Sequence, residues 1–262
     1  MKNAIAFLFF SFIFLQAQNS KIVATKINFV PTETKIFSGR DSYGYNYYIN
    51  NAVFYKIKEK EHWEYKNVSL GNLTKIDINN PLKIVLFYQD FNAVILLDNQ
   101  LNETQRIFFF QSENPINVIA TGIAAQNQLW IYNNLNQQIG LYNYLNNTYK
   151  TISIPFPDNI QWYQTDFNHF YWVDDKNNAF VCNLFGKVSN LGKTPLFDWI
   201  EFTDNQQFIY SKEGRLFFEN TLKKERFEIE ILEKTFQKCY YKDQILSIFT
   251  TEGITNYKII TP

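Results

Sequence analysis

Few residues in this sequence have the types and spacing that catalysis or metal binding would need. Its two histidines are His62 and His169, and His169 lies in DFNHFYWVDD, close to Asp166 and to the pair 174–175. These neighbours would suit a base or a metal ligand. A zinc site, however, usually takes three or four His, Cys or carboxylate ligands at close spacing, and the sequence shows no such cluster. We therefore expect His169 to be a structural residue at the start of a strand.

The segment DDKNN at 174–178 offers the oxygen ligands that calcium prefers. It lacks the glycine and the distal glutamate of a calcium-binding loop. Asp and Asn are also favoured in tight hairpin turns, because they tolerate left-handed backbone angles. We interpret the segment as a turn. The sequence also has no G-x-S-x-G elbow and no phosphate-cradling glycine loop, so we expect a non-catalytic protein without a metal or a cofactor.

The charge balance argues against nucleic acid as a partner. The 25 basic and 25 acidic residues give a formal net charge of zero, with no long run of one sign, whereas nucleic-acid binding needs a basic patch or stripe. The cysteines are Cys182 and Cys239. They could form a disulfide in an oxidising compartment or be small buried hydrophobes, and their positions in non-adjacent repeats favour the second reading.

The N-terminus reads as a signal peptide. Lys2 precedes the apolar run from Ala4 to Leu15, which is broken only by Ser11. A membrane span needs about 20 apolar residues, so this run is too short, but it suits a secretory segment cleaved near Ala17. A buried N-terminal strand or helix is the alternative. We predict a signal peptide at 1–18 and a single domain at 19–262 that is periplasmic, possesses no direct membrane span and is peripheral to the outer membrane.

One hairpin pattern recurs along the chain: a β-rich run, a polar turn and a second β-rich run. It appears six times, at 45–57, 83–97, 129–142, 170–185, 208–219 and 245–260. Equivalent apolar positions in the first runs are Tyr48, Phe87, Ile131, Trp172, Tyr210 and Phe249, which are 39, 44, 41, 38 and 39 residues apart. A strand-rich repeat of this length is typical of a β-propeller blade. A β-sandwich or two half-domains would leave the period unexplained.

Each repeat has room for four strands, except the last, which ends after its hairpin. The segment Lys21–Val30 precedes the first repeat without a partner of its own. We predict that it supplies the outer strand of the last blade, because this pairing closes the ring and removes an exposed sheet edge. The fold class is therefore all-β, a six-bladed β-propeller closed by the N-terminal strand. The 18% aromatic content is expected mainly to fill the core between blades rather than to stack on sugars.

Partner-binding candidates come from the turns between second and third strands, which emerge on one face of a propeller. Phe91, at the tip of the turn 89–92, is the one aromatic of these turns, and exposed aromatics are enriched at interfaces. It could instead fold back over a neighbouring blade. Phe156, between two prolines of a blade link, is a second possible anchor. The predicted partner-binding residues are Gln89, Asp90, Phe91, Asn92 and Phe156.

The segment Thr74–Glu103, TKIDINNPLKIVLFYQDFNAVILLDNQLNE, resembles a family of exported proteins from gliding bacteria of the Bacteroidota type. The predicted signal peptide and the Asn-, Lys- and Phe-rich composition fit that source. In size and export the chain also resembles the periplasmic plug subunits of the type 9 secretion translocon. That resemblance implies a partner in a large outer-membrane barrel or translocon complex. It carries over no functional residue, because plugging depends on shape.

Three functions remain open at this point. A docking propeller, for which the resemblance suggests the plug, predicts a stable protein partner and no turnover. A small-ligand or glycan-binding propeller predicts a concave, aromatic-lined pocket. A hydrolase or lyase predicts clustered acids or histidines on the first strands, which hold only Asp77, Asp166, Asp198 and Glu201. The scarcity of acids makes the enzyme the least favoured of the three.

Overall fold

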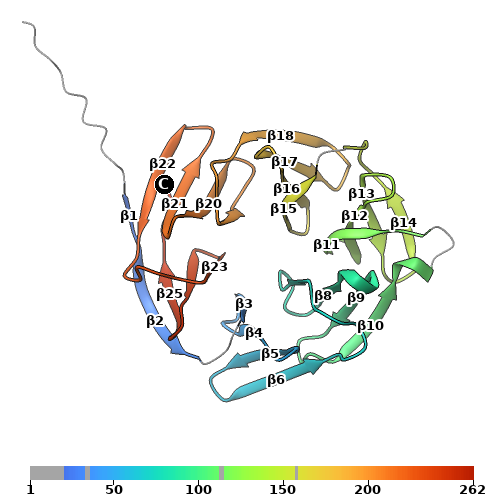
Figure 1. Ribbon diagram of the computed structural model, residues 1–262, viewed down its shortest axis with the longest axis horizontal. Helices are drawn as coiled ribbons and strands as arrows, with labels where there is room; N and C mark the ends of the chain where they lie inside the picture. The colour runs from blue at the N-terminus through green and yellow to red at the C-terminus, as the bar shows by residue number, and fades with distance from the viewer. Residues whose placement is uncertain (1–20, 33–35, 112–114, 157–158) are drawn as a thin grey trace, which may run out of the picture.

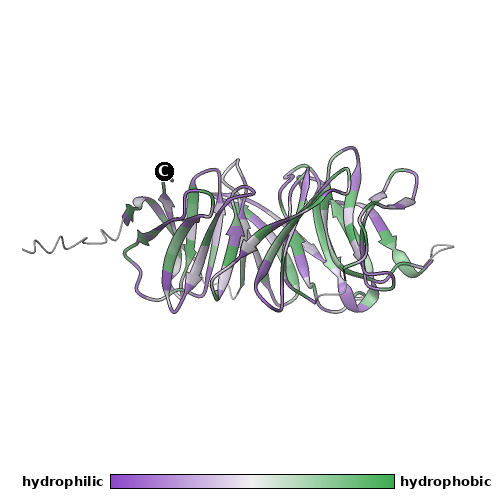
Figure 2. Ribbon diagram, turned by 90° about the horizontal axis from the view of Figure 1, so that it is seen from above, coloured by the Kyte–Doolittle hydropathy of each residue, from purple (hydrophilic) through white to green (hydrophobic). Residues whose placement is uncertain are grey.

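Six sheets surround a central axis and form a disc (Figures 1 and 2). The structure is a computed structural model, which describes residues 21–32, 36–111, 115–156 and 159–262. The predicted signal peptide lies outside the described residues. The prediction of an all-β, six-bladed propeller is confirmed.

Each blade is an antiparallel sheet whose first strand lies nearest the axis (Figure 1). Blade 1 holds β3 (Ile36–Arg40), β4 (Asn46–Asn50), β5 (Val53–Lys58) and β6 (Glu61–Lys66); blade 2 holds β7 (Lys75–Asp77), β8 (Ile84–Tyr88), β9 (Ala93–Leu97) and β10 (Glu103–Phe108); blade 3 holds β11 (Val118–Ala124), β12 (Gln128–Asn133), β13 (Gln138–Asn143) and β14 (Thr148–Thr151). Blade 4 holds β15 (Ile160–Thr165), β16 (His169–Asp174), β17 (Asn178–Asn183) and β18 (Val188–Lys193); blade 5 holds β19 (Trp199–Phe202), β20 (Gln207–Lys212), β21 (Arg215–Asn220) and β22 (Glu225–Glu230); blade 6 holds β23 (Lys238–Lys242), β24 (Ile245–Phe249) and β25 (Gly253–Lys258). Two single-turn 3₁₀ helices, η1 (Gln89–Phe91) and η2 (Phe109–Gln111), flank strands of blade 2. The six predicted hairpins coincide with the second and third strands of the six blades.

The N-terminal segment closes the ring, as predicted, but it is divided between two blades. Strand β2 (Thr25–Pro31) pairs antiparallel with β25 and completes blade 6. Strand β1 (Lys21–Val23) instead pairs parallel with β22 and becomes a fifth strand of blade 5. The prediction that all of 21–30 belongs to the last blade was therefore wrong for its first residues. The physical reason is packing and charge: Ile22 is buried against Ile229, and Lys21 forms an ion pair with Glu230.

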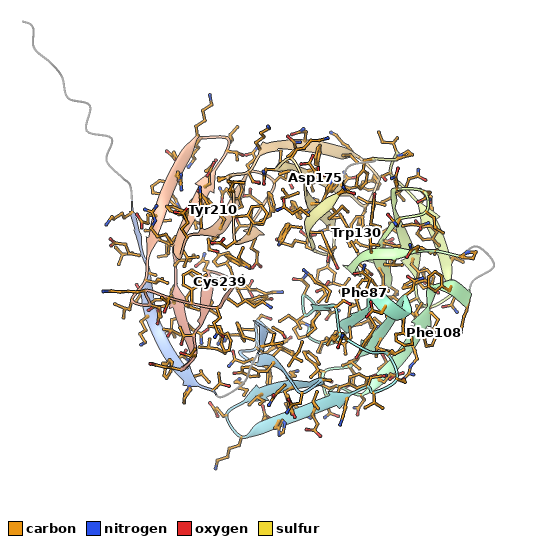
Figure 3. The ribbon with its side chains drawn as sticks, viewed as in Figure 1. Phe87, Phe108, Trp130, Asp175, Tyr210 and Cys239 are labelled. Carbon is orange, nitrogen blue, oxygen red and sulfur yellow. The ribbon has the colours of Figure 1, made fainter. Side chains whose placement is uncertain are left out.

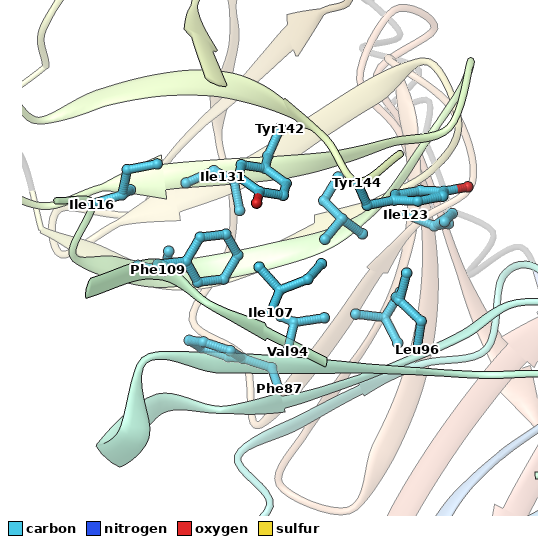
Figure 4. Close-up of a cluster of buried hydrophobic side chains, with 13 residues drawn as sticks. Phe87, Val94, Leu96, Ile107, Phe109, Ile116, Ile123, Ile131, Tyr142 and Tyr144 are labelled. Atoms are coloured by element: carbon cyan, nitrogen blue, oxygen red, sulfur yellow. The ribbon is translucent and has the colours of Figure 1, made fainter. Parts of the chain in front are cut away.

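The core lies between neighbouring blades. Strands β8 and β9 are buried at every position, because a blade covers each of their faces, which explains their continuous apolar sequences. Figure 4 shows one such interface, where Phe87 and Val94 of blade 2 face Ile131 and Tyr142 of blade 3. Outer strands such as β14 are only partly buried. Most aromatic rings therefore serve packing, as expected, with Trp130 and Trp172 among the largest fully buried side chains.

The two faces of the disc follow from the alternation of strand direction. One face carries the turns between second and third strands together with the links that join successive blades. We call it the link face. The other face carries the turns between first and second strands and between third and fourth strands, and we call it the opposite face. First strands begin at the link face and end at the opposite face.

Candidate functional site

The first strands surround a central channel that contains a cavity of about 430 Å³. Side chains from the surrounding blades point into this centre, and Cys239 marks the inner strand of blade 6 (Figure 3). Five blades contribute to the lining. Its ionisable and amide side chains are Lys75, Asp77, Asn79, Gln164, Glu201 and Lys238, and its larger aromatic side chains are Trp162, Tyr163, Trp199 and Tyr240.

Asp77 joins the first strands of three blades. Its Oδ1 accepts the Asn79 backbone N–H at 2.8 Å, and its Oδ2 accepts the Ile123 N–H at 2.8 Å and the Thr165 hydroxyl at 3.1 Å. Burial raises the pKa of Asp77, and these three donors oppose that shift. Gly122 allows Asp77 and Thr165 to lie this close to its backbone, because a Cβ there would be 2.0 Å from Thr165 Oγ1 and 2.6 Å from Asp77 Oδ2. The carboxylate is therefore fixed in a structural role.

Asn79 lies beside Asp77 and extends this network across the channel. Its Nδ2 donates to the Thr165 carbonyl oxygen at 2.7 Å. Lys242 Nζ donates to Asn79 Oδ1 at 3.2 Å and to its carbonyl oxygen at 3.3 Å. Blades 2, 4 and 6 thus meet where the first strands end, and this narrows the channel toward the opposite face.

Two lysines lie nearer the link face, at the beginning of their strands. The ammonium of half-buried Lys75 lies 4.7 Å from the ring centre of Tyr163 and donates to the Tyr163 carbonyl oxygen at 3.4 Å. Lys238 starts β23 and lines the same cavity. Within the part of the chain that the structure describes, the ion pairs are Lys21–Glu230, Arg106–Glu103 and His169–Asp166, so neither channel lysine has one. Burial lowers the pKa of Lys75, whereas Lys238 stands at an exposed position.

Glu201 is the second acid of the cavity. Its Oε2 accepts the Tyr241 N–H at 3.1 Å, which joins blade 5 to blade 6. Burial raises the pKa of Glu201 to about 7, against the opposing effect of the nearby lysines. Gln164 makes the equivalent bridge from blade 4 to blade 5, since it accepts the Phe202 N–H at 2.9 Å and donates to the Phe202 carbonyl at 3.0 Å. The cavity thus combines two ammonium groups without ion-pair partners, a carboxyl group with a pKa of about 7 and aromatic walls.

Three of the predicted partner-binding residues, Gln89, Asp90 and Phe91, form η1 on the link face. The Phe91 ring is 46% exposed, and it lies over Gly71 of the preceding blade link, where a Cβ would be 3.3 Å from the ring. Phe91 therefore partly folds back and partly faces solvent. Its binding role, and that of Gln89 and Asp90, stays a prediction.

Asn92, predicted beside them, has a structural role instead. It is 1% exposed and has a left-handed backbone with φ of 48°. Its Nδ2 donates to the Ile116 carbonyl at 2.5 Å and its Oδ1 accepts the Val118 N–H at 2.9 Å. The side chain ties blade 2 to blade 3 and is not available to a partner, which corrects the prediction for this residue.

Phe156, the other predicted anchor, is half-buried. Its ring stacks on Trp172 at 4.6 Å between centroids and packs against Tyr132 at 4.8 Å. It packs, partly buried, against the core between blades 3 and 4, and its binding role stays a prediction.

The acids outside the channel that resembled catalytic or metal-binding residues stabilise turns. Asp166 accepts the N–H groups of Asn168 and His169 and pairs with the His169 ring. Asp174 accepts the backbone N–H groups of Lys176 and Asn178 and the Asn178 side chain, as expected of a turn residue. Cys182 and Cys239 are both buried and free. Among the described residues, no group of three His, Cys, Asp or Glu side chains could hold a metal ion.

The sequence pointed to only part of the channel site. Of the four first-strand acids, Asp77 and Glu201 line the cavity, whereas Asp198 accepts the Glu213 N–H in a turn. The lysines were missed. A signal for them was present in the sequence. Each lysine belongs to an inner strand, in KID and KCYYK, and the inner strands of a propeller usually have apolar or small residues.

Comparisons with known proteins support the fold. No family model matches the sequence, and no curated protein matches it either. A member of the DUF4221 family from Bacteroides vulgatus has a TM-score of 0.58 and 10% identity over 92% of this chain and 97% of that one. A catalytically inactive variant of virginiamycin B lyase from Staphylococcus aureus, solved with quinupristin, has a TM-score of 0.54 and 11% identity over 92% of this chain and 100% of that one. The extracellular domain of a putative one component system from B. thetaiotaomicron has a TM-score of 0.51 and 10% identity over 89% of this chain and 40% of that one.

At these identities the likeness shows the β-propeller fold alone, since one fold hosts many functions. A search of the described residues for membrane-spanning helices finds none of sufficient length and hydropathy.

Proposed function

We propose that this protein is a non-catalytic, exported β-propeller that docks through its link face on an outer-membrane protein complex. The observation that carries the proposal is a set of exposed apolar side chains on the five links that join blades 1 to 6. Each link has one: Val68, Phe110, Ile154, Leu196 and Leu232, which are 57% to 83% exposed. Exposed apolar side chains are typical of interaction surfaces. The opposite face also has some, at Tyr43, Leu82, Leu145, Phe167, Phe185 and Leu222, so the assignment to the link face rests on the regular placement of one apolar side chain on every blade link.

The finer proposal is that the partner is the type 9 secretion translocon and that the protein closes the periplasmic end of its barrel. Support comes from the resemblance of Thr74–Glu103 to exported Bacteroidota proteins and from the expected signal peptide. The closed disc and the side chains of Asn79 and Lys242 across its channel suit a component that obstructs an opening. Periplasmic export is part of this proposal, and it agrees with the extracellular setting of one similar structure.

The test is affinity purification of the tagged, natively expressed protein in mild detergent, with mass spectrometry of the proteins recovered. We expect an outer-membrane barrel in stoichiometric amount. A link-face variant, Val68→Ser/Leu196→Ser/Leu232→Ser, should lose that partner. The matched control on the opposite face, Leu82→Ser/Leu145→Ser/Leu222→Ser, replaces residues of similar exposure and should retain it.

Recovery of the wild-type protein alone, as a monomer, would overturn the docking proposal and favour the alternative of a small-ligand or glycan-binding propeller. Loss of the partner only in the opposite-face variant would overturn the assignment to the link face. Recovery of an outer-membrane barrel other than the translocon would overturn the proposal that the protein closes the translocon.

A further inference from the structure

We propose that the channel cavity binds a small organic anion, with its acidic group between Lys75 and Lys238 and its apolar body against Trp162 and Trp199. The site goes beyond the docking function and does not depend on it. It lies at the inner strands, whereas the docking surface lies on the blade links, so each proposal can fail alone.

The two ammonium groups of the cavity are the first argument. Lys75 donates only a long hydrogen bond to a carbonyl oxygen, at 3.4 Å, and no described carboxylate forms an ion pair with it or with Lys238. Lys75 is half-buried, and an ammonium taken out of water without a partner is unfavourable, so an anion placed beside it would remove that penalty. Lys238 is exposed and adds a second positive charge to the cavity lining.

The acids in the cavity do not fill this role. Asp77 already accepts three hydrogen bonds from groups of blades 2, 3 and 4. Glu201 accepts the Tyr241 N–H, and a carboxyl group with its pKa near 7 is partly protonated at neutral pH. The charges of Asp77 and Glu201 act on the lysines through space, but neither acid forms an ion pair with them, so both ammonium groups keep hydrogen-bond donors for an anion.

The aromatic walls are the second argument, and they define the rest of the ligand. Trp199 starts β19 and Trp162 is the third residue of β15, and both are only partly buried. Both line the cavity together with Tyr163 and Tyr240. The volume of about 430 Å³ falls in the range of about 300–1,000 Å³ that is typical of small-molecule sites. A flat or apolar organic acid fits this combination better than an inorganic ion.

The experiment compares two fluorescent probes that share a ring system and differ in charge. One is 8-anilinonaphthalene-1-sulfonate, and the other is uncharged N-phenyl-1-naphthylamine. We expect the sulfonate to bind the folded protein with one-to-one stoichiometry, with energy transfer from tryptophan that falls in Trp162→Phe. The uncharged probe should bind about tenfold more weakly or worse, the change expected for a lost charged hydrogen bond.

Lysine variants locate the anion. Lys75→Met and Lys238→Met keep the apolar stem and remove the charge, and each should weaken sulfonate binding about tenfold without changing the binding of the uncharged probe. Lys150→Met, at an exposed position of β14, is the control and should bind like the wild type. If Lys75→Met does not fold, Lys238→Met decides alone, because this residue starts its strand and is exposed. Equal affinities for the two probes, or unchanged sulfonate binding in Lys238→Met, would overturn the proposal.

Discussion

Asn79 Nδ2 donates a 2.7 Å hydrogen bond to the carbonyl oxygen of Thr165, although blade 3 lies between the blades that carry them. Lys242 of blade 6 donates to the same asparagine. Blade 2 is thus tied to two blades that are not its neighbours in the ring. Contacts across the axis add to the packing between neighbours, so a local change at Asn79 should affect the whole disc.

Asn79→Ala should lower the free energy of unfolding by about 1–3 kcal/mol, because the Thr165 carbonyl oxygen loses its side-chain donor and Lys242 Nζ loses one of its two acceptors. Urea denaturation measures the change. Asn80→Ala is the control, since the Asn80 side chain accepts the nearby Leu82 N–H within the same turn. If Asn79→Ala lowers the free energy of unfolding no more than Asn80→Ala does, the cross-channel hydrogen bonds contribute little to stability.

The fold was largely predictable because it depends on local patterns. Strands such as β8 and β9 have unbroken apolar sequences bounded by turn residues, and the repeat of about 40 residues indicates blades. The pairing of β2 with β25 was predictable because the last repeat lacks a fourth strand and the N-terminal segment has no partner in the first repeat. The change of partner at β1 was not predictable, because the parallel contact of Ile22 with Ile229 joins residues more than 200 positions apart.

The site was less predictable for a related reason. The channel brings together Lys75, Glu201 and Lys238 from three blades. Their spacing in the sequence does not indicate that they lie close together. Asn92 failed as a surface candidate, since it is 1% exposed, and Phe156 is half-buried against the core, because the tertiary contacts of both residues cannot be read from the sequence. A turn asparagine in the left-handed region can still direct its side chain into the next blade.

Successive N-terminal truncations should separate the roles of β1 and β2. A protein that starts at Ala24 loses only the short parallel pairing with β22 and should melt within a few degrees of the full domain. A protein that starts at Thr32 also loses β2, so blade 6 exposes an unpaired edge and the ring opens. We expect a large fall in melting temperature for this second form alone. Equal melting of the two truncated forms would contradict closure by β2.

Glu201→Gln should change how stability depends on pH. The folded-state pKa of Glu201 is about 7, above its ordinary 4.5, so the folded protein holds this proton more tightly than the unfolded chain. The stabilisation is complete below about 4.5 and is lost as pH rises through about 7. Glutamine mimics the protonated form.

The variant should therefore be more stable than the wild type at pH 8, by about 2–3 kcal/mol, and nearly equal at pH 4. Lys75, Lys238 and Lys242 face Glu201, and they are common to both proteins. The difference between the two pH–stability curves, from chemical denaturation, isolates Glu201. A constant difference across this range would show that the carboxyl group does not titrate as described.

Cys182 and Cys239 should react with a thiol reagent only after unfolding. Both are buried in different blades, and burial raises the pKa of Cys182 to about 12 and that of Cys239 still further, so little thiolate is present. Titration with a chromogenic disulfide should find no reactive thiol in the native protein and two in denaturant. Absence of both thiols in the unfolded, non-reduced protein would instead reveal a disulfide.

Phe91→Ala should leave the fold intact and weaken capture of the outer-membrane partner. The ring is 46% exposed and lies against Gly71 of the blade link, so its loss opens no cavity in the core and should cost about 0.5 kcal/mol or less. An exposed aromatic anchor at an interface typically contributes more than about 1 kcal/mol to binding. Phe167→Ala on the opposite face is the matched control, since Phe167 is 40% exposed. Recovery of the partner should fall several-fold for Phe91→Ala and stay unchanged for Phe167→Ala, and equal recovery by both would remove Phe91 from the interface.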